Sequence, residues 1–170
     1  TRVADGAMEK TLIVGAPAPV VRSTSYPGCG EGAVRCAYVS GTGILRGFVI
    51  TNGYTEGDVA GSAGNDYCYG GGILAVTGGR IEDCLITQCR ARRGEGACGG
   101  RLRRCRFLKI ATNPYNDWGG GNYGITEISD CYFDYCGELD SCPNTFVNNF
   151  VGRHDAGGSS RARTLYALIS

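Results

Sequence analysis

Arginine is the residue type in this sequence that is best placed to do chemistry. Between Arg90 and Lys109 the chain carries eight basic residues and one acidic residue, Glu95, whereas the formal net charge of the whole chain is only +1. The guanidinium group is planar and permanently charged, so it binds carboxylate, sulfate and phosphate groups well. We therefore consider Arg90, Arg92 and Arg93 as candidate ligands for an acidic molecule such as a polysaccharide.

Aromatic side chains form a second candidate binding surface. Tyr115 and Trp118 lie in the apparent insertion "TNPYNDW". Aromatic rings on loops can stack on sugar faces. They can equally anchor a loop on the protein or bury it against another subunit, where Tyr and Trp are enriched. The sequence favours loop packing or subunit contact over sugar binding.

The cysteines suggest a structural role rather than catalysis. The chain contains Cys29, Cys36, Cys68, Cys84, Cys89, Cys98, Cys105, Cys131, Cys136 and Cys142. An even set at this density favours disulfides and an extracellular or cell-surface location, and the competing interpretation is buried free thiols. There is no C-x-x-C pair and the only histidine is His154, so neither a zinc site nor a nucleophilic cysteine is expected.

Oxygen ligands for a metal are sparse. Asp134, Glu138 and Asp140 form a loose acidic group that could bind calcium. Their spacing is irregular, and a solvated loop is the better interpretation. The sequence therefore predicts no metal and no other cofactor.

The elements that carry these residues are expected to be strands. The chain has 170 residues, of which 29 are glycine, and each glycine inside a helix costs about 1 kcal/mol relative to alanine. The apolar content of 42% argues against disorder. We expect one all-β domain over residues 1–170.

A nine-residue pattern occurs four times in the chain. The copies are "LRGFVITNG" from Leu45, "IEDCLITQC" from Ile81, "LRRCRFLKI" from Leu102 and "ISDCYFDYC" from Ile128. Positions one, four, six and nine are mostly apolar, which indicates a short strand, a bend and a second short strand. The copies start 36, 21 and 26 residues apart, and a minimum period with insertions at turns is typical of a solenoid.

Stacking the copies pairs charged residues. Glu82 falls opposite Arg103, and Arg104 falls between Asp83 and Asp130, at the spacing of about 4.8 Å between neighbouring strands. Opposite charges on adjacent strands contribute roughly 0.2 to 1 kcal/mol and disfavour slipped registers. We therefore predict that these five residues form charge pairs between coils rather than a binding site.

The copies resemble coils of the right-handed parallel β-helix domains of large secreted or surface-attached bacterial proteins. That group includes the pectate-lyase-like and polymorphic outer-membrane-protein-like repeats. The resemblance rests on "GILRGFVITNG", "GGGILAVTGGRIEDCLIT" and "ISDCYFDYC" and extends over residues 11–150. It implies about four to six short coils with Gly-rich turns and loop insertions. It says little about activity, because the functions of the family range over adhesion, polysaccharide cleavage and structural shafts.

The resemblance brings no catalytic site to this chain. Lyases of the family use an Arg base beside acidic calcium ligands, and its hydrolases use clustered Asp with a nearby His. Here only "RHDAGG" from Arg153 places such residues together, beyond the recognisable coils. We predict no catalytic residues and lean towards a protein that is not an enzyme.

The repeat pattern changes at both ends of the coil region. "KTLIVG" from Lys10 indicates an earlier strand. After Cys136 the register weakens, and "CPNTFVNNFVG" from Cys142 resembles half of a coil that begins too soon to complete a turn. Residues 151–170 are expected to be a C-terminal extension in which "RTLYALIS" could form a closing strand.

These features predict an extracellular structural or interaction module. A short solenoid without caps exposes unpaired strand edges, so copies are expected to stack end to end into a filament or to form part of a surface shaft. The alternative is a domain that binds or degrades an acidic polysaccharide. Nucleic-acid binding and membrane insertion are not expected, because the net charge is +1 and no apolar run suits a bilayer.

Overall fold

This computed structural model describes residues 2–4, 9–20, 27–56, 68–76, 78–110, 121–134, 136 and 145–151. Its regular elements are the strands β1 (Arg2–Ala4), β2 (Glu9–Val14), β3 (Ala37–Val39), β4 (Ile44–Arg46), β5 (Phe48–Thr51), β6 (Ile73–Ala75), β7 (Arg80–Glu82), β8 (Leu85–Thr87), β9 (Ala97–Cys98), β10 (Arg101–Arg103), β11 (Arg106–Leu108), β12 (Asn122–Tyr123), β13 (Glu127–Ser129), β14 (Tyr132–Asp134), β15 (Thr145–Val147) and β16 (Phe150–Val151). In these segments no helix has the length and apolarity that crossing a membrane requires.

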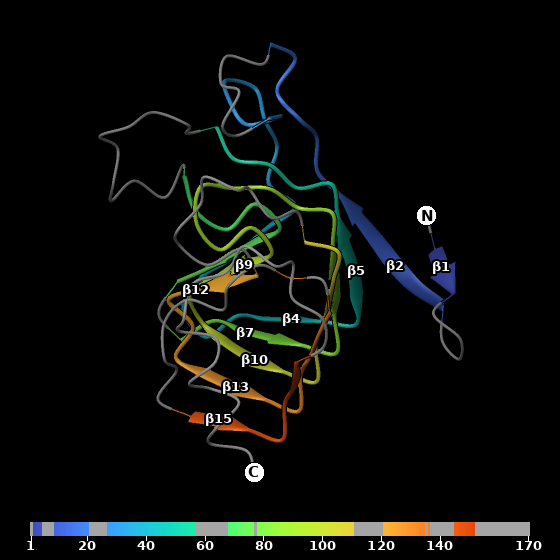
Figure 1. Cartoon of the computed structure of the whole chain (residues 1–170), viewed down its shortest axis with the longest axis vertical. Coiled ribbons are helices and arrows are strands. Elements are labelled where there is room, and N and C mark those ends of the chain that lie inside the picture. Colours follow the sequence, from blue (N-terminus) through green and yellow to red (C-terminus); the bar gives the residue numbers. More distant parts are fainter. Residues whose placement is uncertain are drawn as a thin grey trace.

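The strands form three sheets. Sheet 1 has seven strands in the order β1-β2-β5-β8-β11-β14-β16, sheet 2 has five in the order β15-β13-β10-β7-β4, and sheet 3 has four in the order β12-β9-β6-β3. Neighbours are parallel except for the β1–β2 pair, which is antiparallel. In Figure 1 the strands of sheet 2 lie one below another.

The chain passes through sheets 3, 2 and 1 in turn and then repeats. Each pass forms one coil: the first coil is β3-β4-β5, the second β6-β7-β8, the third β9-β10-β11 and the fourth β12-β13-β14. Strand β2 precedes the first coil, and β15 and β16 follow the fourth. The fold is therefore an all-β parallel β-helix, which confirms the fold class predicted from the repeats.

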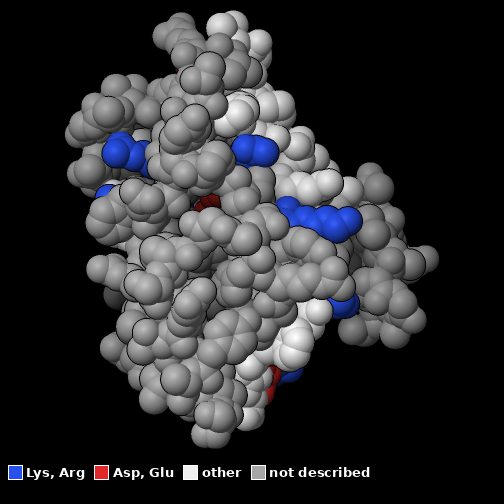
Figure 2. All heavy atoms as spheres, viewed as in Figure 1, with Lys and Arg blue, Asp and Glu red and all other residues white. Residues whose placement is uncertain are grey.

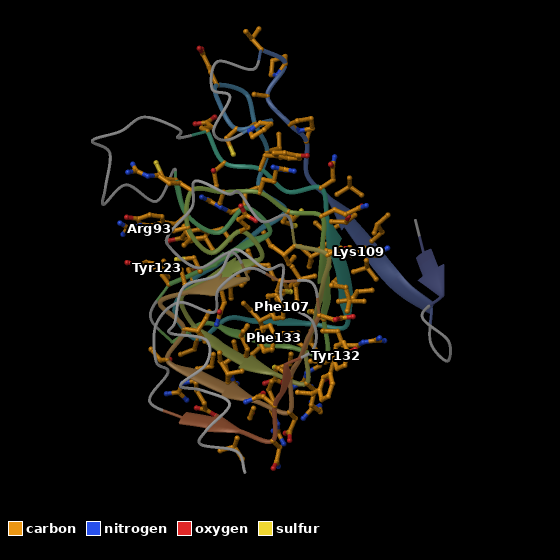
Figure 3. The ribbon with its side chains drawn as sticks, viewed as in Figure 1. Arg93, Phe107, Lys109, Tyr123, Tyr132 and Phe133 are labelled. Carbon is orange, nitrogen blue, oxygen red and sulfur yellow. The ribbon has the colours of Figure 1, made fainter. Side chains whose placement is uncertain are left out.

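The strand register matches the columns of the sequence pattern. Position one holds Leu45, Ile81, Leu102 and Ile128 on successive coils. Position six holds Ile50, Ile86, Phe107 and Phe133. Each of these side chains points inward and packs on its counterpart one coil away, as for Phe107 and Phe133, whose rings stack with centroids 4.8 Å apart (Figure 3).

A single left-handed residue makes the bend between sheets 2 and 1. Position three of the pattern has a positive φ in every copy, at Gly47, Asp83, Arg104 and Asp130, and Asn148 continues the row. One residue in this conformation reverses the pleat, so the residues on both sides of it can face the core. Asp and Asn tolerate the left-handed region better than most residues, whereas Arg104 is an unusual occupant of it.

Glycines let the coils approach one another where sheet 3 begins. A Cβ atom on Gly71 would lie 2.1 Å from the carbonyl oxygen of Arg90, and one on Gly72 would lie 2.4 Å from the carbonyl oxygen of Gly96. No side chain fits at such distances from main-chain atoms. The Gly-rich turns therefore set the close stacking of successive coils.

Within the described residues, the strands at both ends of the stack can be compared with the sequence pattern. The strand expected near Lys10 is β2, and β1 pairs with its first half to form a hairpin at one side of the body (Figure 1). The segment from Cys142 was expected to resemble half of a coil in a weakened register. Strands β15 and β16 form these two passes, and the register holds: Phe146 pairs with Ile128, and Phe150 with Tyr132. A shorter connection than in the other coils does not prevent this pairing.

Candidate functional site

Charged side chains line the outer face of sheet 2 and its bend. Glu82, with 7% of its side chain exposed, accepts a hydrogen bond from the Arg46 Nε at 3.0 Å and lies 3.8 Å from Arg104 Nη2. Arg104 also donates to both carboxylate oxygens of Asp83, at 2.7 and 2.8 Å. Hydrogen bonding to Asp83 raises the pKa of Arg104, with smaller contributions from the charges of Glu82 and Asp130.

Arg103 and Asp130 take a smaller part in this network. The register places Arg103 opposite Glu82, yet within the described segments Arg103 forms no ion pair, because Arg46 and Arg104 occupy the Glu82 carboxylate. Asp130 accepts a hydrogen bond from the Asn148 amide at 3.4 Å. The charges on this face thus neutralise one another across coils and leave Arg103 directed to solvent.

The candidate arginines follow β8. Arg93 donates through one nitrogen to the hydroxyl groups of Tyr69 at 3.4 Å and of Tyr123 at 3.0 Å. Its guanidinium carbon lies 5.6 and 5.1 Å from the centroids of the same two rings, and Figure 3 shows it beside Tyr123. Arg93 therefore joins three neighbouring segments of the solenoid through cation–π and hydrogen-bond contacts.

Arg90 and Arg92 are half-buried beside Arg93 in the sequence. The main chain of Arg90 takes part in the stack, since its N–H donates to the Gly53 carbonyl oxygen at 2.8 Å. Figure 2 shows the described Lys and Arg side chains of one face as separate groups rather than as a continuous patch.

Several predicted site residues lie outside the described part of the chain. They are Tyr115, Trp118, Glu138, Asp140, Cys142 and His154. Residues 152–170, with the expected closing strand, also lie outside it. Within the described segments no group of three or more His, Cys, Asp or Glu side chains has an arrangement that could hold a metal ion.

The nine described cysteines are free thiols, so the disulfides expected from the composition are not found among them. Cys84, Cys105 and Cys131 do share an inward column, as the pattern predicted. Each of these thiols donates to a nearby main-chain carbonyl oxygen, for example Cys84 to Glu82 at 3.2 Å and Cys131 to Ser129 at 3.2 Å. The sulfurs fill core positions as small apolar groups with satisfied S–H donors.

Burial and sulfur–sulfur contacts control the ionisation of these thiols. Burial raises the pKa of Cys136 to about 12. The pKa of Cys105 is also raised to about 12, first by its hydrogen bond with Cys131 and then by burial. The same hydrogen bond lowers the pKa of Cys131. Cys105 and Cys136 therefore stay neutral at physiological pH.

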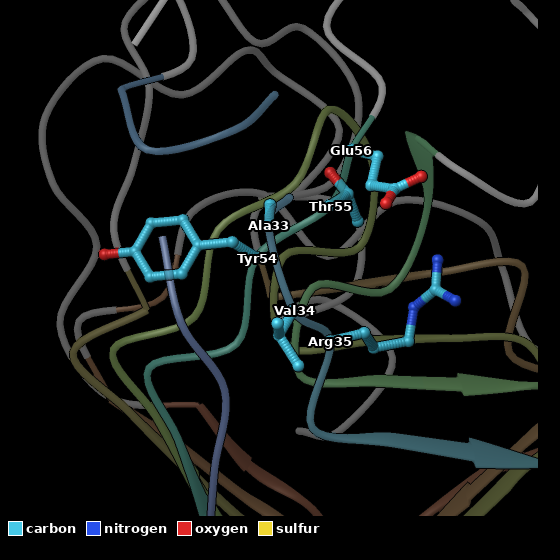
Figure 4. Close-up of a pocket in the computed structure, with 6 residues that line it drawn as sticks. All are labelled: Ala33, Val34, Arg35, Tyr54, Thr55 and Glu56. Carbon is cyan, nitrogen blue, oxygen red and sulfur yellow. The ribbon is translucent and has the colours of Figure 1, made fainter. Parts of the chain in front are cut away.

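A shallow pocket of about 320 Å³ opens on the first coil (Figure 4). It is lined by Ala33, Val34, Arg35, Tyr54, Thr55 and Glu56. Arg35 is fixed by hydrogen bonds from its Nε and Nη2 to the carbonyl oxygens of Gly70 and Tyr69, both at 2.8 Å. The volume lies at the lower limit of small-molecule sites, and Arg35 and Glu56 are the charged residues that line it.

Among the described residues, the solenoid core is least well covered at its N-terminal end. Ile13, Ala37 and Leu45 head the three inward columns and remain partly exposed. The residues beneath them in the same columns are buried: Ile50, Ile73 and Ile81 are each 0% exposed. No described strand lies above β3 or β4, so the apolar columns and the strand edges end together at this face.

Exposed apolar side chains gather at the two ends of the described stack. Near the N-terminal end they are Val14, Val20, Val34, Tyr38 and Ile44, with exposures between 45% and 61%. Near the C-terminal end they are Val147 at 47% and Phe150 at 56%. The coils between carry no exposed large apolar residue within the described segments. The sequence predicted exposed ends but did not identify these residues. The only available signal was the position of a residue in the first copy of the repeat.

Comparisons with protein families, curated proteins and solved structures found no match to this chain.

Proposed function

We propose that this chain is a structural and interaction module that assembles with copies of itself through the ends of its solenoid. The observation that carries the proposal is the partial exposure of Ile13 in β2 and of Ala37 and Leu45 in the first coil, at the head of columns whose other described members are buried. Apolar surface of this kind gains about 25 cal/mol for each Å² removed from water. Covering the end is therefore favourable.

Unpaired strand edges support the same proposal. Sheets 2 and 3 end at β4 and β3, whose outer N–H and C=O groups have no strand partner within the described residues. Such edges template the addition of another chain unless charge or a covering segment protects them. These two edge strands instead carry exposed apolar side chains: Tyr38 on β3 is 57% exposed, and Ile44 on β4 is 45% exposed.

The geometry of the ends favours an open assembly over a closed one. The two ends carry different residues, so contact between the N-terminal end of one copy and the C-terminal end of another is heterologous. Heterologous contacts that do not close into a ring produce filaments. A filament, or a segment of a longer surface shaft, is thus the assembly that we propose.

An extracellular or cell-surface location belongs to this proposal through the resemblance to bacterial β-helix repeats. The cysteines lend it less support than their number suggested, because those described are free thiols. The polysaccharide alternative has less support still. Arg93, one of its three candidate arginines, is engaged with Tyr69 and Tyr123, and the aromatic candidates lie outside the described residues.

Sedimentation across a concentration series, followed by electron microscopy, tests the proposal. We expect the wild-type chain to form particles that lengthen with concentration. Ile44→Lys and Tyr38→Lys should reduce assembly, because they place charges at the exposed edges of β4 and β3. Thr87→Lys, on the outer face of the second coil, is the matched control and should assemble like the wild type. Compact monomers of the wild type at every concentration would reject the proposal.

A further inference from the structure

One described cysteine differs from the others in its access to solvent. Cys36 is partly exposed, whereas the other eight described cysteines are buried. It lies directly before β3 on the first coil, where the core residues of the described chain are only partly buried. Thiol oxidation requires access to the oxidant, so Cys36 is expected to be more reactive than the eight buried cysteines.

A second thiol lies beside Cys36 on the next coil. The Cys36 Sγ lies 3.1 Å from the Thr51 carbonyl oxygen, and the Cys89 Sγ lies 3.2 Å from the Thr87 carbonyl oxygen. Thr51 and Thr87 are register partners on β5 and β8, so the two sulfurs bind equivalent carbonyls one strand spacing apart. A side-chain hydrogen bond between the two thiols is the largest influence on the pKa of each.

Two glycines make room for these sulfurs. A Cβ atom on Gly53 would lie 2.8 Å from the Cys36 Sγ, and one on Gly72 would lie 3.0 Å from the Cys89 Sγ. Gly53 occupies position nine of the first copy, the position that Cys89 holds in the second. Because Gly53 has no side chain, Cys36 can reach the space next to Cys89.

The interaction between the two thiols also shifts their pKa values in opposite directions. The hydrogen bond from Cys89 lowers the pKa of Cys36, burial opposes this, and a backbone hydrogen bond at Gly15 lowers the pKa further. The hydrogen bond with Cys36 raises the pKa of Cys89, and burial raises it again. Within the pair, Cys36 is therefore the thiol that loses its proton at the lower pH.

We infer that Cys36 is a peroxide-reactive modification site and that Cys89 is its resolving thiol. In the first step the Cys36 thiolate attacks a peroxide ROOH, the O–O bond breaks, and Cys36 sulfenic acid forms as RO⁻ leaves and takes a proton from water. In the second step the Cys89 sulfur attacks the sulfenic sulfur. An S–S bond forms, the Cys89 proton and the departing hydroxyl group leave as water, and two thiols have been oxidised by one peroxide.

In the rival pair the main-chain N–H of Cys105 donates to the Cys131 Sγ at 3.4 Å, and a side-chain hydrogen bond with Cys105 lowers the pKa of Cys131. These residues are 0% and 2% exposed in the middle of the stack. A peroxide can reach them only after the coils separate. The folded chain should therefore react at Cys36 first.

The test follows alkylation and oxidation of the folded, fully reduced full-length chain, peptide by peptide, by mass spectrometry. We expect iodoacetamide to modify Cys36 on the order of tenfold faster than Cys84, Cys105 or Cys131. One equivalent of hydrogen peroxide should then yield a Cys36–Cys89 disulfide. In the Cys89→Ser variant the reaction should stop at a Cys36 sulfenic acid that dimedone traps.

Cys131→Ser serves as the matched control and should leave the Cys36–Cys89 product unchanged. Circular dichroism of each variant establishes that the chain is folded, and Cys36→Ser should abolish the cross-link while leaving Cys89 reduced. Alkylation of Cys36 no faster than that of the buried thiols would overturn the inference. A first cross-link between any other two cysteines would overturn it as well.

Discussion

Arg104 holds Asp83 with two parallel hydrogen bonds across one coil of the solenoid, at 2.7 and 2.8 Å. Both residues are the left-handed members of their bends, with φ of 50° and 54°. The pair thus joins the bends of the second and third coils directly. With side-chain exposures of 41% and 34%, it lies where solvent and salt can screen it.

Removing the charges of this pair should lower the free energy of unfolding only slightly, and the loss should depend on the salt concentration. We expect a double-mutant cycle of Asp83→Asn and Arg104→Gln, measured by urea unfolding, to give a favourable coupling at low salt that is nearly lost at about 1 M salt. Asn keeps a residue that accepts the left-handed conformation. Arg103→Gln is the control and should show no coupling to Asp83. A coupling that salt leaves unchanged would refute this account.

Phe107 should be among the most sensitive positions of the core. It is 0% exposed and stacks on Phe133, so Phe107→Ala should lower the free energy of unfolding by about 3 to 5 kcal/mol. Phe150→Ala is the control, because Phe150 stacks on Tyr132 with centroids 5.0 Å apart but is 56% exposed. Its cost should be below about 1 kcal/mol. Equal costs for both variants would contradict the assigned burial.

Two glycine substitutions should have opposite outcomes. Gly71→Ala should destabilise the chain by at least about 2 kcal/mol, because the new Cβ would lie 2.1 Å from the Arg90 carbonyl oxygen. Gly47 has a φ of 79° and no atom within 4 Å of an added Cβ. Gly47→Asn should therefore leave stability within about 0.5 kcal/mol or raise it. Urea midpoints measure both, and a tolerated Gly71→Ala would disprove the close approach.

The buried thiols predict a loss of stability at alkaline pH. The pKa of Cys136 is about 12 in the folded chain, against a reference of 9.0. Below pH 9 both states keep the proton, but between pH 9 and 12 the unfolded state alone releases it, so stability falls as pH rises. The difference corresponds to about 4 kcal/mol for this residue. In Cys136→Ala the fall in unfolding free energy between pH 8 and about pH 11 should be smaller; an unchanged pH profile would contradict the assignment.

The sequence by itself determined the fold and the inward columns. Four copies of one pattern place Ile81 against Leu102 because parallel coils bury like positions over like positions. The left-handed bend at position three is also compatible with what the copies show, since Gly, Asp and Asp occupy it in three of them. Repetition carries this information because one period fixes the geometry of every coil.

Only the tertiary structure determined which residues the outward side chains contact and where the stack ends. Glu82 faces Arg103 in register, but Arg46 and Arg104 reach its carboxylate, because long outward side chains are not confined to their own column. The contact between Cys36 and Cys89 joins residues outside any shared column and depends on the missing side chain of Gly53. The partial exposure of the first coil could be recognised only when the surroundings of Leu45, which depend on its three-dimensional neighbours, were known.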